Sequence, residues 1–241
     1  MKTLNTLLLL LTLSFGAHAS EAVHLQNADI DLSDNASLLR GAHHFVSYCL
    51  GCHSAKQIRY LRIALDLGVD EKKMLKDIAP EGAGIYDKML TAMNAHDATK
   101  WFGVQPPDLS LIARSRGADW LYSYLKGFYV EKGKAPLGVN NIVFEDVGMP
   151  NVLWQLQGEQ KPIYKTVDGQ QVIDKLVIEE KGTLSEKEFD QFVNDLVNFL
   201  VYVGEPVQME RQSMGKYVLF FILMFLALAY LLKKEYWKDV H

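Results

Sequence analysis

The sequence predicts a mainly α-helical exported domain with extended loops and a small β-hairpin, followed by one C-terminal transmembrane helix. Two stretches, residues 37–48 and 185–203, repeat apolar side chains at helical spacing, and a Cys-x-x-Cys-His motif follows the first of them directly. An uninterrupted apolar run extends from Tyr217 to Leu232 near the C-terminus. The 241 residues suffice for one medium domain with additional segments.

The N-terminus has the features of a secretory signal peptide. Lys2 supplies a short basic region, residues 7–13 are apolar, and Ala17-His18-Ala19 has the small-x-small pattern of a cleavage site. We therefore expect residues 1–19 to be removed, so that the mature chain begins at Ser20. The apolar run is too short for a membrane anchor.

The C-terminal apolar run reaches bilayer length when Met214 and Gly215 are included. A buried core helix is the alternative, but no polar face interrupts the run. Basic residues follow it, namely Lys233, Lys234 and Lys238, and basic residues favour the cytoplasmic side. The expected organisation is a periplasmic domain at 20–210, an anchor at 211–234 and a cytoplasmic tail at 235–241, single-pass in a bacterial inner membrane.

Further elements are predicted between the termini. Residues 22–34 are expected to be an extended lead-in, and Asp168-Gly169 predicts a hairpin between residues 164–167 and 170–177. A Gly- and Pro-rich stretch, 127–147, is expected to be a long ordered loop. Asp108 or Ser110 is a candidate cap for the helix after the Pro-Pro turn. The expected helices are 37–48, 57–67, 71–78, 111–115, 119–128 and 185–203, the last with a capping box of Ser185 and Glu188.

The exported segment is acidic. Between residues 20 and 210 there are 27 Asp and Glu residues and 19 Lys and Arg residues. Such a surface does not attract nucleic acid, but it can steer a basic soluble partner or serve solubility alone. Composition does not separate these two readings.

The motif Cys49-Leu50-Gly51-Cys52-His53 is the signal for covalent attachment of a c-type haem. Two thiols at this spacing each add to one haem vinyl group, and the following histidine is placed to bind the iron. A thioredoxin-like redox pair needs a βαβ context, which does not precede Cys49. A structural zinc site needs a second Cys or His pair, and Cys49 and Cys52 are the only cysteines.

The second axial position on the iron calls for another ligand, or stays open for ligand binding or peroxidase chemistry. Met149 is the favoured candidate, because Gly148 and Pro150 frame it in an irregular loop that can present a thioether sulfur. Met74, Met89 and Met93 fall in expected helices, where packing is the ordinary role, and Met209 is too near the anchor. His43 and His44 are alternative ligands, although a helical or surface histidine is the simpler interpretation.

Haem propionates need charged partners, and Arg114 and Arg116 are candidates. Solvated surface arginines are an equally good interpretation of both.

Taken together, these residues resemble the cytochrome c1 family of the ubiquinol:cytochrome c oxidoreductase. The resemblance covers nearly the whole mature chain and includes the C-terminal transmembrane helix. The motifs that carry it are Arg40-Gly41, Tyr48 to Ser54, Arg59-Tyr60, Trp101-Phe102-Gly103, Pro106-Pro107-Asp108-Leu109-Ser110, Ile112 to Gly117 and Gly148-Met149-Pro150. After Met149, where the family often has small residues and prolines, this chain has Pro150-Asn151-Val152-Leu153-Trp154.

The resemblance implies a class I-like cytochrome c domain with one haem c on Cys49 and Cys52 and with His53 and Met149 as axial ligands. It also implies that Arg116 binds a propionate and that Pro107 lies in a turn packed on the haem. The expected function is transfer of single electrons from a Rieske iron–sulfur protein to a soluble or membrane cytochrome c, beside cytochrome b in a dimeric complex. The subunit would have no chemistry of its own. The alternative is a stand-alone membrane-anchored cytochrome c that serves a terminal oxidase.

Overall fold

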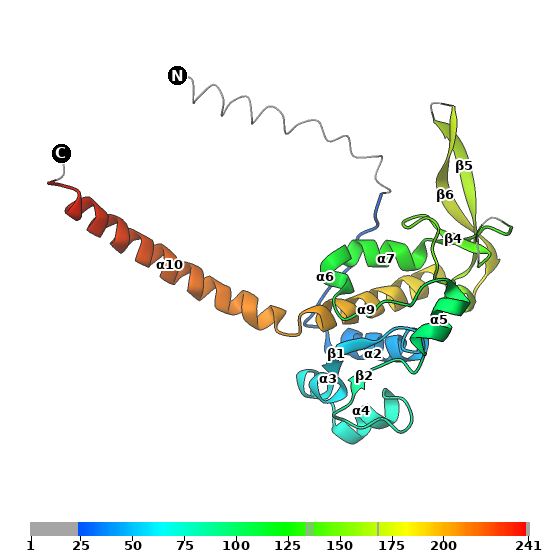
Figure 1. The fold of residues 1–241 in the computed structure, drawn as a ribbon, viewed down its shortest axis with the longest axis horizontal. Coiled ribbons are helices and arrows are strands. Elements are labelled where there is room, and N and C mark those ends of the chain that lie inside the picture. The colour runs from blue at the N-terminus through cyan, green and yellow to red at the C-terminus, as the bar shows by residue number, and fades with distance from the viewer. Residues whose placement is uncertain (1–23, 134, 136, 168, 240–241) are drawn as a thin grey trace.

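The structure is a computed structural model that describes residues 24–133, 135, 137–167 and 169–239 (Figure 1). The predicted signal peptide lies outside these residues. The helices are α2 (Asn35–Tyr48), α3 (Tyr60–Leu67), α4 (Glu71–Asp77), α5 (Ala95–Phe102), α6 (Ile112–Arg116), α7 (Ala118–Lys126), α8 (Trp154–Gln157), α9 (Glu186–Gly204) and α10 (Gln208–Tyr236). The strands are β1 (Ala55–Arg59), β2 (Lys88–Met89), β3 (Phe128–Val130), β4 (Val139–Asn141), β5 (Gly158–Val167) and β6 (Gln170–Lys181).

The centre of the domain is the crossing of α2 and α9, which among the described helices are the first and the last before α10 (Figure 1). Gly41 lies at the crossing, where a Cβ atom would be 2.0 Å from the carbonyl oxygen of Asp195. Only glycine permits this approach of the two backbones. Phe45 packs on Phe199 beside it, with ring centroids 5.8 Å apart. α2 and α9 therefore pack directly on each other.

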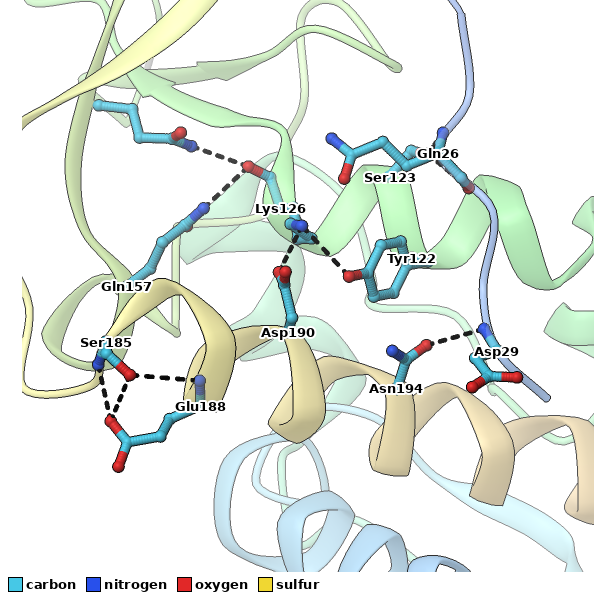
Figure 2. Close-up of polar contacts among 11 residues, drawn as sticks. Gln26, Asp29, Tyr122, Ser123, Lys126, Gln157, Ser185, Glu188, Asp190 and Asn194 are labelled. Carbon is cyan, nitrogen blue, oxygen red and sulfur yellow. Dashed lines mark hydrogen bonds and ion pairs between the residues drawn. The ribbon is translucent and has the colours of Figure 1, made fainter. Parts of the chain in front are cut away.

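α7 is attached to α9 by polar contacts at its C-terminal end (Figure 2). The Lys126 ammonium pairs with Asp190 of α9 and donates to the Tyr122 hydroxyl at 3.2 Å. The Lys126 carbonyl accepts from the side-chain amides of Gln157 and Gln160, at 2.9 and 2.8 Å. These bonds hold the base of the β5–β6 hairpin against α7.

α9 begins as its sequence predicts. The Ser185 hydroxyl accepts from the Glu188 backbone N–H, and the Glu188 carboxylate accepts in return from the Ser185 N–H at 2.9 Å (Figure 2). The capping box is therefore confirmed.

The strands form three separate antiparallel pairs, β1–β2, β3–β4 and β5–β6. The predicted hairpin is confirmed and is longer than expected, and it projects beyond the body of the domain (Figure 1). Two sequence predictions were wrong here. The helix expected from Gln57 begins at Tyr60, because the preceding residues pair with β2. The expected loop 127–147 contains β3 and β4, so the preceding helix ends at Lys126.

The described part of the lead-in, residues 24–34, has no helix or strand and is bound to the domain by backbone donors. The N–H of Gln26 donates to the Ser123 hydroxyl at 2.8 Å, and that of Asp29 to the Asn194 side chain at 3.1 Å. The lead-in thus runs across α7 and α9 (Figure 2).

α10 leaves the domain as a single 29-residue helix (Figure 1). It contains an 18-residue window of mean hydropathy 2.1, and none of that window is buried against the rest of the chain. An apolar helix that packs on nothing in its own domain is suited to a lipid environment and not to a soluble core.

Candidate haem site

The haem-attachment motif forms a tight turn at the end of α2. The N–H groups of Cys52 and His53 both donate to the Cys49 carbonyl, at 3.0 and 2.8 Å, so the chain folds back on itself within five residues. Asp34 caps the other end of α2, where its carboxylate accepts from the Ser37 N–H at 3.0 Å. α2 therefore delivers both sulfurs and the histidine as one compact unit.

The two thiols have different surroundings. Cys49 is buried, and burial raises the pKa of its thiol to about 12. Cys52 is half-buried, and the pKa of its thiol is also raised by burial. Both residues carry unbridged thiols. They are therefore chemically competent for two thioether bonds.

His53 is held in one orientation by a backbone carbonyl. Its Nδ1 lies 2.7 Å from the carbonyl oxygen of Pro107, and since that oxygen only accepts, Nδ1 carries the proton. The remaining nitrogen, Nε2, then has its lone pair available for a metal. Burial lowers the pKa of His53, which favours the neutral ring that metal ligation requires.

The segment that contains Pro107 is fastened to the residues after the motif. The Leu109 N–H donates to the Ser54 carbonyl at 2.8 Å, and Asp108 accepts from the Lys56 N–H at 2.9 Å. Ser110 accepts from the Gln57 N–H at 3.1 Å. The prediction that Asp108 or Ser110 caps α6 was wrong, because both side chains are used in this fastening and α6 has no side-chain cap.

Met149 lies half-buried in the irregular loop after β4. Its sulfur accepts a hydrogen bond from the Tyr124 hydroxyl of α7, with 3.4 Å between the oxygen and the sulfur. The segment between Pro107 and Tyr124 thus contacts His53 near its start and Met149 near its end.

The other methionines have different surroundings. Met74 and Met89 are fully buried in the core, and Met209 is half exposed in the first turn of α10. The placement of Met89 and Met93 in helices was wrong, because Met89 pairs within β2 and Met93 precedes α5. Pairing of β2 with β1 decides the backbone conformation of Met89.

The two arginines differ in their contacts. Arg114 forms an ion pair with Glu205, which lies between α9 and α10. The Arg116 guanidinium lies 5.1 Å from the centre of the Trp120 ring and has no carboxylate partner among the described residues. Arg116 is therefore the arginine still able to bind an anionic group.

A stack of aromatic rings continues from Arg116 along one face of α7. Trp120 and Tyr124 are parallel, with centroids 4.9 Å apart, and Tyr124 meets Phe128 edge-on at 5.2 Å. The contact between Tyr124 and Met149 was not predicted from the sequence. The spacing of four residues between Trp120 and Tyr124 was the available signal that these two rings share a helix face.

His44 packs in the α2–α9 interface and not at the motif. Its ring stacks on Phe192 of α9 at a centroid distance of 4.0 Å, and burial lowers its pKa to about 4.

A cavity of about 890 Å³ lies between the base of the β5–β6 hairpin and the start of α9. None of the motif residues lines it.

The fold and the motif define a membrane-anchored c-type cytochrome. The model of the Cytochrome C1 family matches residues 27–240 of the chain. The chain belongs to this family, and it carries one haem c attached through Cys49 and Cys52.

Three relatives illustrate the range of similarity. Cytochrome c1 of Allochromatium vinosum is 50% identical over 90% of each chain, and cytochrome c1 of Rhodospirillum rubrum is 27% identical over 86% of this chain and 83% of its own. A Nitrosomonas europaea protein named ammonia monooxygenase gamma subunit is 46% identical over the full length of both. As a member of the Cytochrome C1 family, the chain is the membrane-anchored haem c subunit of the quinol:cytochrome c oxidoreductase, which also contains cytochrome b and the Rieske protein. The alternative, a stand-alone membrane-anchored cytochrome c, is not favoured.

Proposed function

We propose that His53 and Met149 are the two axial ligands of the haem iron. The observation that carries this proposal is the 2.7 Å contact between His53 Nδ1 and the Pro107 carbonyl, which leaves Nε2 free to bind the iron. Hydrogen bonding of the second ring nitrogen is the usual way in which proteins orient a metal-binding histidine. Pro107 thus acts through its backbone oxygen.

A histidine and a methionine give a c-type haem a raised reduction potential and leave no open position on the iron. The site then passes single electrons and needs no proton donor or nucleophile. Arg116 lies over the Trp120 ring, and Trp120 stacks on Tyr124, the residue that contacts Met149. Arg116 would bind a propionate through charge-assisted hydrogen bonds.

The chain would cross the membrane once, with 20–210 in the periplasm, 211–234 in the bilayer and 235–241 in the cytoplasm. Lys233, Lys234 and Lys238 at the C-terminal end of α10 support this orientation. A cysteine placed at the exposed Lys187 should react with a membrane-impermeant maleimide in intact spheroplasts. One at Lys238 should react only after lysis, and the reverse pattern would invert the topology.

The electron acceptor would be a soluble or membrane cytochrome c, and the assembled complex would be dimeric. The acidic balance of the exported domain favours an acceptor with a basic docking face, because opposite charges accelerate encounter. The same balance disfavours nucleic acid.

The experiment that tests the assembly is purification through this chain in mild detergent, with optical and electron paramagnetic resonance spectra of the product. We expect b-type haem and a Rieske signal to co-purify in stoichiometric amounts. If a monooxygenase copurified instead, the chain would belong to the assembly that the name of the Nitrosomonas relative indicates. A single c-type haem under gentle conditions would contradict membership of the oxidoreductase.

A further inference from the structure

The hydroxyl of Tyr124 donates to the Met149 sulfur. A thioether sulfur has no proton and is only an acceptor, so the direction of this 3.4 Å contact is fixed. A phenol has a pKa of about 10, and its hydroxyl therefore carries its proton at neutral pH. Nothing in the attachment of haem or in the family motif requires a hydroxyl at this position.

The Tyr124 ring packs against two other aromatic rings. Trp120 is parallel to it at 4.9 Å, with 10° between the ring planes, and Phe128 meets it edge-on at 5.2 Å. The hydroxyl has little freedom to choose another partner, because the ring that carries it is fixed by α7 and by the start of β3.

The backbone of Tyr124 is also connected to the segment that leads to Met149. Its carbonyl accepts from the Asn141 side-chain amide at 2.8 Å, and the Asn141 oxygen accepts in turn from the Val143 N–H at 2.9 Å. Tyr124 therefore holds this segment at two points, eight residues apart, and the second point is the sulfur itself.

We propose that Tyr124 is a positioning residue for the methionine ligand, holding one lone pair of the Met149 sulfur while the other binds the haem iron. This inference rests on the proposed ligation by Met149. The sulfur has two lone pairs, so the hydrogen bond and the bond to iron are compatible.

The hydrogen bond has two expected consequences. The positive end of the O–H dipole points at the ligand atom, which disfavours the additional positive charge of ferric iron and raises the reduction potential. The bond also restrains the sulfur, so that an external ligand has to break it before it displaces Met149. A residue that only filled space would produce neither effect.

The test compares Tyr124→Phe with Tyr122→Phe in the full-length, haem-loaded protein. Tyr122 lies on the same helix, and its hydroxyl accepts from Lys126 (Figure 2), so the control removes a hydroxyl without touching Met149. We expect Tyr124→Phe to have a lower midpoint potential and a several-fold higher affinity for imidazole. Tyr122→Phe should match the wild type in both. Wild-type potential and imidazole affinity in Tyr124→Phe would overturn the proposal.

Met149→Leu separates this proposal from the ligation on which it rests. If Met149→Leu changes the potential and Tyr124→Phe does not, Met149 is the ligand and the role of Tyr124 is refuted. If neither variant changes the potential, the ligand assignment itself is refuted, and with it the inference about Tyr124.

A measurement on the unmodified protein keeps the proposal testable if the variants do not fold. In the reduced protein with labelled Met methyl groups, the Tyr124 hydroxyl proton should exchange slowly and show a nuclear Overhauser effect to the Met149 methyl group. A rapidly exchanging hydroxyl, or no such effect on a resolved Met149 methyl signal, would overturn the proposal.

Discussion

Arg40 of α2 and Asp195 of α9 form a two-point ion pair across the central helix crossing, with nitrogen–oxygen distances of 2.6 and 2.9 Å. The Asp195 side chain is 2% exposed, whereas that of Arg40 is 47% exposed. The carboxylate therefore depends on the arginine, while the arginine retains contact with water. Removing Arg40 therefore leaves a buried charge unpaired, whereas removing Asp195 leaves a charge that water can still reach.

Replacing Arg40 with Met should destabilise the domain, because it leaves a buried carboxylate without its cation while keeping the apolar stem. We expect a loss of about 2 kcal/mol in the free energy of unfolding, in the range for hydrogen bonds to charged groups. Denaturant unfolding followed by circular dichroism measures it. Lys161→Met, at an exposed pair with Glu179 on the hairpin, is the control and should cost about 0.5 kcal/mol or less.

The same pair predicts a pH dependence. Burial opposes the charge of Asp195, but hydrogen bonds led by that from Arg40 lower its pKa below 3.8. A lowered carboxyl pKa stabilises the fold above the unfolded-state value and ceases to do so as the pH falls through the folded-state value. In Arg40→Met, the burial remains while the leading hydrogen bond is lost and that from Gln191 is kept, so the pKa of Asp195 should rise.

The stability gap between wild type and Arg40→Met should therefore be largest at neutral pH. It should narrow as the pH falls first through the raised carboxyl pKa of the variant and then through the lowered one of the wild type. Unfolding curves at several pH values test this. A gap that is constant from pH 7 to pH 3 would show that lost packing, not charge, explains the effect.

Gly41→Ala should be among the more damaging single-methyl substitutions in the chain. The added Cβ would lie 2.0 Å from the Asp195 carbonyl oxygen, so α2 and α9 have to separate. We expect a cost of about 1–3 kcal/mol or more, as for an overpacked core. The control is Gly215→Ala in α10, where a Cβ meets nothing within 4 Å, and it should not lower the yield of haem-loaded protein.

Glu205 connects the haem domain to the membrane helix. Hydrogen bonds from Arg211 of α10, foremost, and from Arg114 after the Pro-Pro turn lower the pKa of Glu205. We expect Glu205→Gln to broaden the distance distribution between spin labels at Lys187 and Ser213, measured by pulsed electron resonance. The wild type should broaden similarly only as the pH falls below about 4, where the carboxylate becomes protonated. An unchanged distribution in the variant would show that other contacts hold α10 in place relative to α9.

Much of this fold was predictable from local patterns. α9 follows from its capping box and apolar stripe, α10 from an apolar run without a polar face, and the hairpin from Asp168-Gly169. These signals depend on neighbouring residues alone. The strand at 55–59 and the pair β3–β4 were not predictable in this way, because long-range pairing overrides local propensity.

In the haem site, too, some residues were predictable from the sequence and others were not. Cys49, Cys52 and His53 were identified because haem attachment imposes a fixed spacing. Pro107 and Tyr124 act through contacts with residues 54 and 25 positions away, and their functional atoms are a backbone oxygen and a hydroxyl. A single sequence does not reveal such contacts unless the fold is known.

The most direct test of the account is the redox titration of Met149→Leu beside Met93→Leu, in the full-length protein. Met149→Leu should keep its covalent haem, have a lower midpoint potential and bind carbon monoxide when reduced, whereas Met93→Leu should behave as wild type. An unchanged potential with no carbon monoxide binding in Met149→Leu would contradict ligation by Met149.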